Sequence, residues 1–510
     1  MAMRTTWLDR AIGAIAPAAG LRRIRQRAAF EIAARSYDAA RPGRNNPALR
    51  RTGSSADSEI GVAAPALRAA MRELVRNNPH GANAVSKWVT NVVGNGIEGR
   101  PKARTEARTK AAAQAWAEWA RRCDADGQLD LNGLQTLAFR QVVEAGEVLI
   151  RRRWRRVTDR VPGNMQIQII EADLIDSLKD GPLPGGNYAI QGVEFDKIGR
   201  RVAYWLFSQH PDNVNYFTRP GITSVRVPAA DVIHVYDKLR TQVRGVPWGT
   251  AAMSALRDLG DYEAAELIRK KIEACMVGVV TGGDENDMGV GIPLDGDQHA
   301  GVYDAQGQSV ERFEPGMFAY ARGGRDIKFN TPAATGSYDA YKRSMLHTVA
   351  AGFRLPYELL TGDLSQVNYS SIRAGLTEYR RLVETVQWQM MIPMMLDRIA
   401  DWFTEAHYLS GAISDDTLTW EWSPPKFYSV DPLKDAMSDL LELRSGLATL
   451  PQKIAERGLD PAAHLAEIAA TNAQLDALNL ILDSDPRTVA KNGALQIQIN
   501  AGDAPAQPPN

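Results

Sequence analysis

One apolar stripe constrains this chain more than any other feature of its sequence. Its residues follow one another at intervals of four and three: Ile372, Leu376, Tyr379, Val383, Val386 and Met390, then Leu396, Ile399 and Phe403. This spacing predicts an amphipathic helix over 371–406, about 50 Å long at about 1.5 Å per residue. Pro393 lies inside it and predicts a kink. Such a helix crosses a whole domain, so other parts of the chain must pack along it.

A polar segment leads directly into this helix. Residues 363–371 (DLSQVNYSS) are rich in hydroxyl and amide groups, contain one aromatic residue and carry no basic side chain. This composition is typical of a surface loop. The sequence therefore predicts a flexible polar loop held at the end of a long helix. The alternative is a helix-capping turn buried in the surrounding domain.

Composition narrows the class of protein. The chain has 510 residues, of which 44% are apolar, enough for several domains with their own cores. The 60 basic and 60 acidic residues cancel, so any contact with nucleic acid must come from local charge. Cys123 and Cys275 form no CxxC pair, which favours a reducing compartment and disfavours a thiolate metal site. Because no apolar run approaches the ~20 residues of a membrane span, we expect a soluble, cytosolic protein without membrane contact.

The N-terminal half changes character along its length. Residues 1–50 contain ten arginines and three acidic residues, either a solvated helix face with a linker or an arm that contacts nucleic acid or an acidic partner. Helices are predicted over 63–93, with a start at Asn78-Pro79 and a stop at Gly94 and Gly96, and over 105–122. Short β-rich runs between about 134 and 240 predict an antiparallel α+β region.

Two features of that region have alternative interpretations. In 147–156 (EVLIRRRWRR), five arginines flank Trp154. This predicts an edge strand guarded by charge, with phosphate binding as the alternative. His234 in DVIHVY is interpreted as a satisfied sheet histidine and not as a catalytic base.

A helix predicted over 250–276 mixes apolar and charged residues around its surface. Leu256 and Leu267 share a side with Glu263, while Ile268 and Ile272 lie near Asp261. Such a helix suits a position between like helices of neighbouring subunits, so these four apolar residues are candidate subunit contacts. The alternative is an ordinary helix with imperfect patterning.

The segment after this helix is acidic and rich in glycine. Residues 281–304 contain no lysine or arginine, and their candidate partner-binding residues are Asp284, Glu285, Asp287, Asp295 and Asp297. The spacing does not fit an EF-hand, so no metal is predicted. Short β-like runs to about Pro332 and a helix over 337–353 follow, and further helices are expected over 433–480 before a polar tail.

Catalytic motifs are missing from the sequence. There is no GxxxxGK[ST], no HExxH and no GxSxG, and the seven histidines occur singly. We therefore expect no enzymatic activity, no cofactor and no metal.

Several segments, in order, together resemble the portal proteins of lambda-type tailed bacteriophages. They are RNNPHGANAVSKWVTNVVGNGI, IIEADLID, GVEFDKIGRRVAYWLF, PAADVIHVYDKLRTQVRGVPWGTAAMSALRDLGDYEAAEL, GFRLPYELLTGDLSQVNYSSIRAGLTEYRR and DPLKDAMSDLLELRSGL. The resemblance covers roughly 60–475.

The resemblance implies an α+β portal fold with named parts. These are a basic N-terminal arm (1–60), a wing (61–249), a first stem helix (250–280), a clip (281–336), a second stem helix (337–360), a tunnel loop (361–371), the long kinked wing helix (372–430), a helical crown (431–480) and a disordered tail (481–510). The clip is implied to be a small α/β insertion that faces partners.

The resemblance also implies a function and partners. Portal proteins form a ring, usually of about twelve subunits, at one capsid vertex. The ring passes double-stranded DNA without sequence specificity during packaging and ejection. Implied partners are the terminase large subunit, the head-completion or adaptor protein and the major capsid protein, and the implied location is the virion after assembly in the host cytoplasm. The residues expected to line the channel are Asp363, Ser365, Gln366, Asn368, Tyr369, Ser370 and Ser371.

Two other classes of protein are considered. One is a DNA-processing enzyme of the packaging machine, a nuclease or ATPase, which requires a carboxylate metal cluster or a phosphate loop. The other is a capsid structural protein that is not a portal, which ring counting distinguishes.

Overall fold

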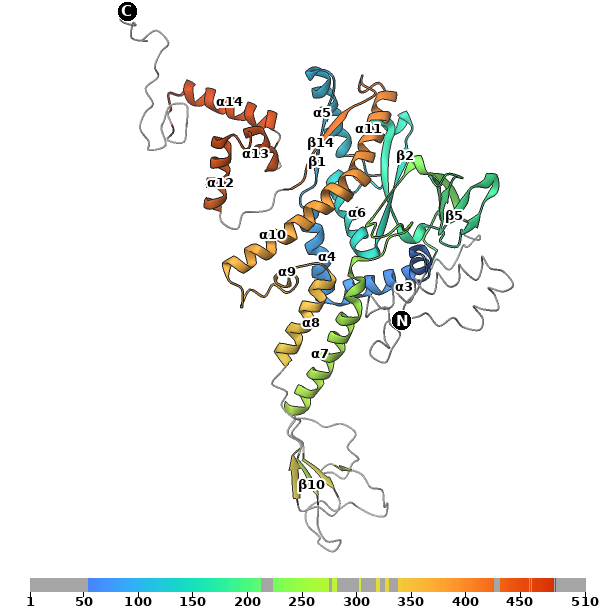
Figure 1. The fold of residues 1–510 in the computed structure, drawn as a ribbon, viewed down its shortest axis with the longest axis vertical. Helices are drawn as coiled ribbons and strands as arrows, with labels where there is room; N and C mark the ends of the chain where they lie inside the picture. Colours follow the sequence, from blue (N-terminus) through green and yellow to red (C-terminus); the bar gives the residue numbers. More distant parts are fainter. Residues whose placement is uncertain are drawn as a thin grey trace, which may run out of the picture. The chain divides into compact units, whose positions relative to one another are not determined.

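The computed structural model describes residues 54–211, 223–274, 278–281, 302–303, 318–321, 326–329, 338–425, 432–457, 459, 461–480 and 482. The chain divides into two compact units, Met1–Glu59 and Ile60–Asn510. The described part of the first unit, 54–59, contains only the start of helix α3 (Ala56–Asn77). The N-terminal arm, most of the clip and the tail lie outside the described residues. Within the described parts, helices and sheets are mixed, which confirms the α+β class (Figure 1).

Among the described residues, four helices precede the first long strand. They are α3, α4 (Pro79–Val92), α5 (Glu106–Ala120) and α6 (Leu131–Ala145). The predicted start of α4 is confirmed, because Asn78 caps it by accepting hydrogen bonds from the backbone of His80 and Gly81. The predicted stop is confirmed as well, since Gly94 and Gly96 have positive φ angles.

Three antiparallel sheets follow from the β-rich region and the chain around it. The first has the order β3-β2-β9, from β2 (Glu147–Trp154), β3 (Met165–Glu171) and β9 (Val232–Tyr236). The second runs β4 (Gly181–Pro182), β5 (Tyr188–Ile190), β6 (Val193–Phe195), β7 (Arg201–Leu206) and β8 (Val225–Pro228) in order. The third pairs β1 (Glu98–Lys102) with β14 (Thr419–Ser423).

Two expectations for this region need correction. Strands were expected from about 134, but helix α6 extends to Ala145, because Leu134, Ala138 and Val142 repeat at helical spacing and are buried. The arginine-rich strand β2 was expected at a sheet edge, but its first part is central, paired with β3 and, over 147–151, with β9, and only the part beyond Arg151 has β3 as its one neighbouring strand. The apolar residues at its start are buried on both faces of the sheet, Val148 and Ile150 in the main core and Leu149 in a second core.

The long helix is confirmed as three consecutive helical segments. These are α10 (Tyr369–Val386), a π-helical segment (Gln387–Leu396) and α11 (Asp397–Leu409), drawn as one path in Figure 1. Pro393 lies inside the π-helical segment. Proline has no N–H to donate, and a wider turn of this kind accommodates such an interruption without ending the helix. The buried Gln387 side chain donates a hydrogen bond to the Val92 carbonyl at 2.8 Å, which fixes this segment to the end of α4.

The remaining helices form smaller groups. Helices α7 (Met253–Ala274) and α8 (Tyr338–Gly352) lie side by side, and α9 (Tyr357–Thr361) follows α8 (Figure 1). Between α7 and α8, the strands β10 (Gly278–Thr281), β11 (Val302–Tyr303), β12 (Phe318–Ala321) and β13 (Asp326–Phe329) form a mixed sheet. The last helices are α12 (Pro432–Ser445), α13 (Leu450–Glu456) and α14 (Pro461–Ala477).

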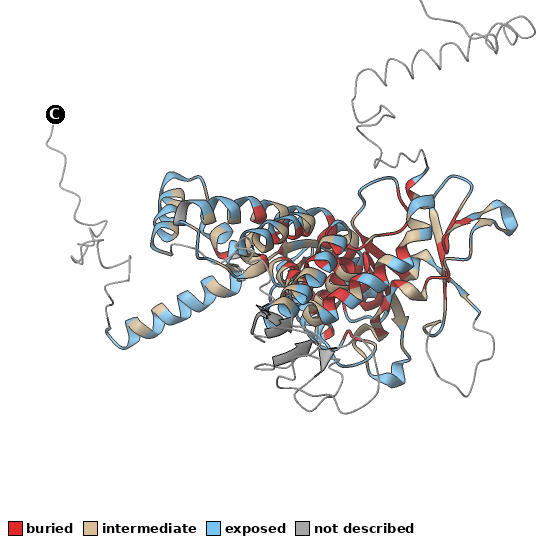
Figure 2. Ribbon diagram, turned by 90° about the horizontal axis from the view of Figure 1, so that it is seen from below, coloured by how far each residue is buried: buried red, intermediate tan, exposed pale blue. Residues whose placement is uncertain are grey.

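The main core joins the long helix to the helices and the first sheet. Trp88 of α4 is fully buried, and its indole donates a hydrogen bond to the Phe353 carbonyl at 2.8 Å, just after α8. The Trp88 ring also meets the edges of Trp248, before α7, and Tyr379 of α10, at centroid distances of 4.7 and 5.4 Å. Figure 2 shows the buried residues gathered in one region, whereas the helix that leads to the C-terminus, α14, contains no buried residue.

Candidate functional site

The polar segment 363–371 is part loop and part helix. The backbone turns at Gly362, whose φ of 74° is left-handed, and α10 begins at Tyr369. Asn368 caps α10, because its side chain accepts a hydrogen bond from the Ser371 N–H at 2.8 Å. Ser370 and Ser371 therefore belong to the first helical turn, and the loop itself is 362–368. This capping turn is exposed at Asn368 and Ser371, not buried, and the side chains of Tyr369 and Ser370 lie outside the described residues.

Asp363 fixes the first half of the loop to the neighbouring helices. Its carboxylate lies 3.1 Å from the Arg343 guanidinium of α8 and accepts hydrogen bonds from the Tyr357 hydroxyl and the Ser365 N–H, at 3.3 and 2.9 Å. Hydrogen bonds from Ser365, and then the charge of Arg343, lower the pKa of the Asp363 carboxyl. The negative charge that the sequence placed in the loop is therefore compensated inside the chain.

The middle of the loop is uncharged and faces solvent. Ser365 and Gln366 are exposed, and Leu364 is 59% exposed. Sequence analysis missed Leu364, although a single leucine in a hydroxyl-rich run is itself an unusual pattern. No residue of 362–368 is basic. This segment offers neutral hydrogen-bonding groups and one exposed apolar side chain, Leu364.

Helices α7 and α8 contact each other through a mixed polar and aromatic seam. Tyr262 of α7 packs on Tyr341 and stacks on Tyr338 of α8, with centroid distances of 4.6 and 6.0 Å. Glu263 pairs with Lys342 at 2.6 Å. The two helices therefore form one unit.

The four candidate subunit contacts on α7 do not share one environment. Leu256 has no exposed surface and lies in the main core of its own chain, so its assignment to a subunit contact is corrected. Leu267 and Ile268 are 56% and 58% exposed, in the part of α7 where none of the described side chains is buried. The side chain of Ile272 lies outside the described residues. The apolar surface that remains available is that of Leu267 and Ile268.

A buried charge cluster fixes the chain just before α7. Glu147 is fully buried and accepts hydrogen bonds from the Arg244 guanidinium, 2.6 Å from Nη2, and from the Gly245 N–H at 2.9 Å. Arg68 of α3 lies 3.3 Å from the same carboxylate. Burial alone raises the pKa of Glu147, but Arg244 and His234 lower it well below its usual range. One carboxylate thus holds α3, β2 and the segment 244–245 together.

His234 completes this cluster in its neutral form. Its Nδ1 accepts a hydrogen bond from Arg201 at 3.0 Å, so its Nε2 carries the proton that is donated to Glu147, also at 3.0 Å. Burial lowers the pKa of His234 to about 4, against the opposing effect of Glu147. The interpretation of His234 as a satisfied sheet histidine is confirmed.

The folded protein should lose stability in mild acid because of this histidine. An unfolded histidine binds a proton near pH 6.5, whereas folded His234 binds one only near pH 4. The free energy of unfolding should therefore fall by up to about 1.4 kcal/mol per pH unit between about pH 6.5 and 4. His234→Gln should flatten this dependence in urea unfolding, while His407, whose pKa burial also lowers to about 4, keeps its own share. If the free energy of unfolding depends on pH equally in the unchanged protein and in His234→Gln, the loss of stability in acid does not come from His234.

A metal site finds little support among the described residues. Glu171, Asp173 and His210 offer ligand atoms within 4.8 Å of one another. However, Arg72 and Arg68 lie 2.6 and 3.3 Å from the Asp173 carboxylate, so its charge is already compensated and we assign no ion.

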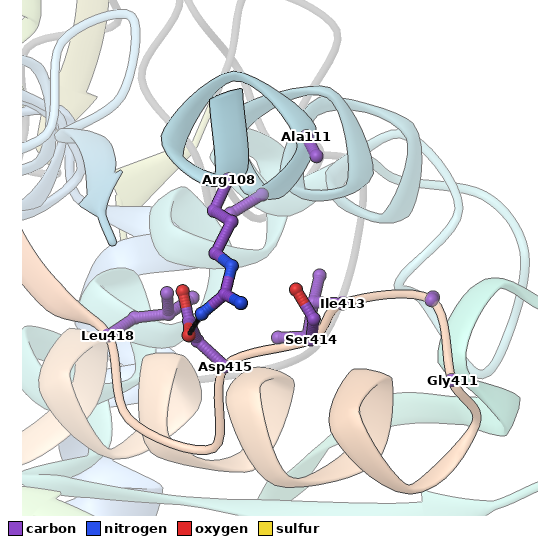
Figure 3. A pocket seen from close by; sticks show the side chains of 9 residues that line it. Arg108, Ala111, Gly411, Ile413, Ser414, Asp415 and Leu418 are labelled. Carbon is purple, nitrogen blue, oxygen red and sulfur yellow. Dashed lines mark hydrogen bonds and ion pairs between the residues drawn. The ribbon is translucent and has the colours of Figure 1, made fainter. Parts of the chain in front are cut away.

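One small pocket lies between α5 and the segment 411–418 (Figure 3). Arg108 reaches across it to Asp415, with 2.7 Å between Nη1 and Oδ1. The pocket has a volume of about 160 Å³, below the roughly 300–1,000 Å³ usual for small-molecule sites. Among the described residues, no helix is long and apolar enough to cross a membrane.

Comparison with known proteins gives the family. The model of the lambda family of phage portal proteins matches residues 42–387. A probable portal protein of Halomonas phage phiHAP-1 is 27% identical, over 83% of this chain and 86% of its own. Portal protein B of Escherichia phage lambda is 20% identical, over 76% of this chain and 80% of its own.

Two chains from solved structures of gene transfer agent (GTA) particles are among those to which this chain is similar. A chain from the neck of an empty GTA particle is 15% identical, with a TM-score of 0.44 over 77% of this chain and 93% of its own. A chain from the native GTA virion is 16% identical, with a TM-score of 0.43 over 81% and 96%. The family match covers both paired helices, the polar loop and all of α10, so the chain belongs to the lambda family of phage portal proteins, which are structural proteins and not enzymes.

Proposed function

We propose that this chain assembles into a closed ring of about twelve copies at one capsid vertex and that double-stranded DNA passes through the ring during packaging and ejection. The observation that carries the proposal is the family match over 42–387, which includes the segments with the most distinctive surfaces. Electron microscopy of the purified protein tests it directly. We expect annular particles with a central hole, and a monomer at micromolar concentration under several salt conditions would contradict the proposal.

In this proposal, α7 and α8 form the stem, and the exposed part of α7 contacts a neighbouring copy. Leu267 and Ile268 support this role, because two adjacent apolar side chains that are each more than half exposed gain stability when a neighbour covers them. Charged residues surround these two side chains, so the apolar and charged residues of α7 are not separated onto two faces. A helix that is covered on several sides by protein needs no single apolar face.

Leu267→Glu should prevent ring formation without unfolding the protomer. The leucine contributes little to its own chain because it is 56% exposed, but a charge buried between copies is strongly unfavourable at every interface of the ring. Light scattering should show at least a tenfold loss of assembled particles, and the thermal midpoint of the protomer should stay within a few degrees. Leu178→Glu, at a 93% exposed position outside α7, is the matched control and should leave rings intact. Normal rings with Leu267→Glu would remove α7 from the interface.

The loop 362–368 and the first turn of α10 are proposed to line the channel. A surface that passes DNA must not retain it, because each basic residue that contacts a phosphate adds affinity. The uncharged, exposed residues Ser365 and Gln366 and the compensated charge of Asp363 support this role. Contact with DNA is then steric and weak, since sequence readout requires donors and acceptors fixed against base edges.

The acidic residues of 281–304 are proposed to bind partners. Asp284, Glu285, Asp287, Asp295 and Asp297 lie outside the described residues, so their role rests on the sequence alone. The proposed partners are the terminase large subunit during packaging and then the head-completion or adaptor protein, with the major capsid protein around the ring. The assigned wing, stem, clip and crown boundaries remain predictions.

A further inference from the structure

Three arginines form a strip on one face of the β2-β3 ribbon. Arg151, Arg153 and Arg155 alternate along the chain and therefore point to the same side of β2 and its continuation. Further back on this face, Leu149 is fully buried in a small second core with Ile170 and Val232. Beyond Arg151 the same face is only half-buried. The strip therefore continues a packed sheet face out towards solvent.

Neutral side chains orient these arginines. The Gln168 side-chain oxygen accepts hydrogen bonds from Nε and Nη2 of Arg153 at 2.8 and 2.6 Å. The Gln166 side-chain oxygen accepts one from Nε of Arg155 at 2.7 Å. Arg153 and Arg155 thus each lean towards a glutamine of β3 and keep their full positive charge, because an amide does not neutralise a guanidinium.

The charge of the strip is not compensated within the described residues. Arg152, on the opposite face, pairs with Asp231 and Glu405. By contrast, no carboxylate of the described residues pairs with Arg151, Arg153 or Arg155, and the Arg151 Nε is buried without a hydrogen-bond partner. Burial, followed by the charges of Arg151 and Arg155, lowers the pKa of Arg153. Three guanidiniums held close together in this way favour an anion.

We propose that this arginine strip binds the phosphate backbone of duplex DNA at a site separate from the channel. A row of like charges along one strand matches a linear polyanion of uniform charge better than the mixed charges of a protein surface. Duplex is favoured over single-stranded DNA because Trp154, the aromatic residue of this segment, lies on the opposite face beside Arg152, at 4.7 Å from its guanidinium. The strip therefore has no aromatic ring of its own on which an unpaired base could stack.

Closed circular duplex DNA is a probe that distinguishes binding at this strip from binding in the channel. A closed circle cannot thread a ring that has already closed, so its binding reports outer surfaces, whether or not the proposed channel exists. The probe is a short closed circular duplex of mixed sequence, and binding is measured over a series of salt concentrations. The test variant is Arg151→Gln with Arg153→Gln and Arg155→Gln. The matched control is Arg104→Gln with Arg200→Gln and Arg444→Gln, which removes the same charge from exposed positions elsewhere.

The expected result is a loss of affinity with a smaller salt dependence. The test variant should bind the circle at least tenfold more weakly at low salt, and its slope of log affinity against log salt should be shallower by about 2.7, or 0.9 for each lost phosphate contact. The control should stay within twofold of the unchanged protein, and the N-terminal arm is identical in all three. Light scattering and thermal unfolding verify that the variants assemble and fold alike.

Two results would overturn the inference. Equal loss in the test and control variants would mean that only net charge matters. Unchanged DNA binding, together with weaker binding of the test variant to a polyglutamate probe, would assign the strip to an acidic protein partner instead. If the protein forms no ring but the circle still binds through the strip, the proposed channel fails while this inference stands.

Discussion

Glu147→Gln is expected to lower the free energy of unfolding by about 3–5 kcal/mol, the usual cost of removing one partner of a buried ion pair. The change keeps the shape of the side chain but leaves the Arg244 guanidinium buried without a carboxylate, and Arg68 keeps only its pairing with Asp173. The segment 244–245 should then lose its fixed position before α7. Urea unfolding monitored by circular dichroism measures the effect.

The control for this change is Glu421→Gln, which removes the partner of Lys102 in an exposed pair on the β1-β14 ribbon. Exposed pairs contribute at most about 1 kcal/mol, so Glu421→Gln should change the free energy of unfolding very little. Adding Arg244→Met to Glu147→Gln should recover part of the loss, because the double change removes both charges. Equal effects of Glu147→Gln and Glu421→Gln would show that the buried cluster is not the main electrostatic support of the fold.

Gln366→Lys should slow or stall DNA packaging at low salt. If the proposed ring is correct, the change adds a cation to each of about a dozen loops, and every lysine that contacts a phosphate steepens the salt dependence of binding by about 0.9. The loop would then hold DNA instead of letting it pass. Packaging in vitro with the terminase should recover as salt is raised, because screening weakens the contacts.

The matched control is Gln366→Glu at the same exposed position, which should package at the normal rate. Gln366 makes a better test than Asn368, since Asn368→Lys would also remove the cap of α10. Stalling with both Gln366→Lys and Gln366→Glu would indicate that the size of the side chain matters and not its charge. Normal packaging with Gln366→Lys at every salt concentration would remove the loop from the DNA path.

The long helix was predictable because its stripe extends far beyond any turn signal. What the sequence did not show is how Pro393 is accommodated, since a kink and a π-helical segment follow from the same missing N–H. The central position of β2 did have a signal. Three consecutive buried apolar residues, Val148, Leu149 and Ile150, are typical of a strand covered on both faces, and the arginines after them drew the interpretation towards an edge.

The candidate site was predictable in part. The loop's position followed from composition, and the cap at Asn368 could have been found, because an asparagine just before a helical stripe is a start signal. The pairing of Asp363 with Arg343 had no signal, since a contact between residues on different elements leaves no periodicity. The difference in burial between Leu256 and Leu267 had no signal in the sequence either. Both lie on the same side of α7, and only the tertiary fold decides that one end of the helix is covered and the other is not.

The two attachments of the loop set its extensibility. Asp363 is tied to α8 through Arg343, and Asn368 is tied to α10 through its cap, so only 364–367 are left to stretch. Five Cα-to-Cα steps span at most about 18 Å when fully extended, at roughly 3.6 Å per residue. If α8 and α10 move apart, the segment 364–367 becomes fully extended. The ion pair, whose two side chains are about one third exposed, is then the weaker end, so it breaks before the first turn of α10 unwinds. The loop would thus lengthen from its α8 end, in a reversible step that leaves the long helix undamaged.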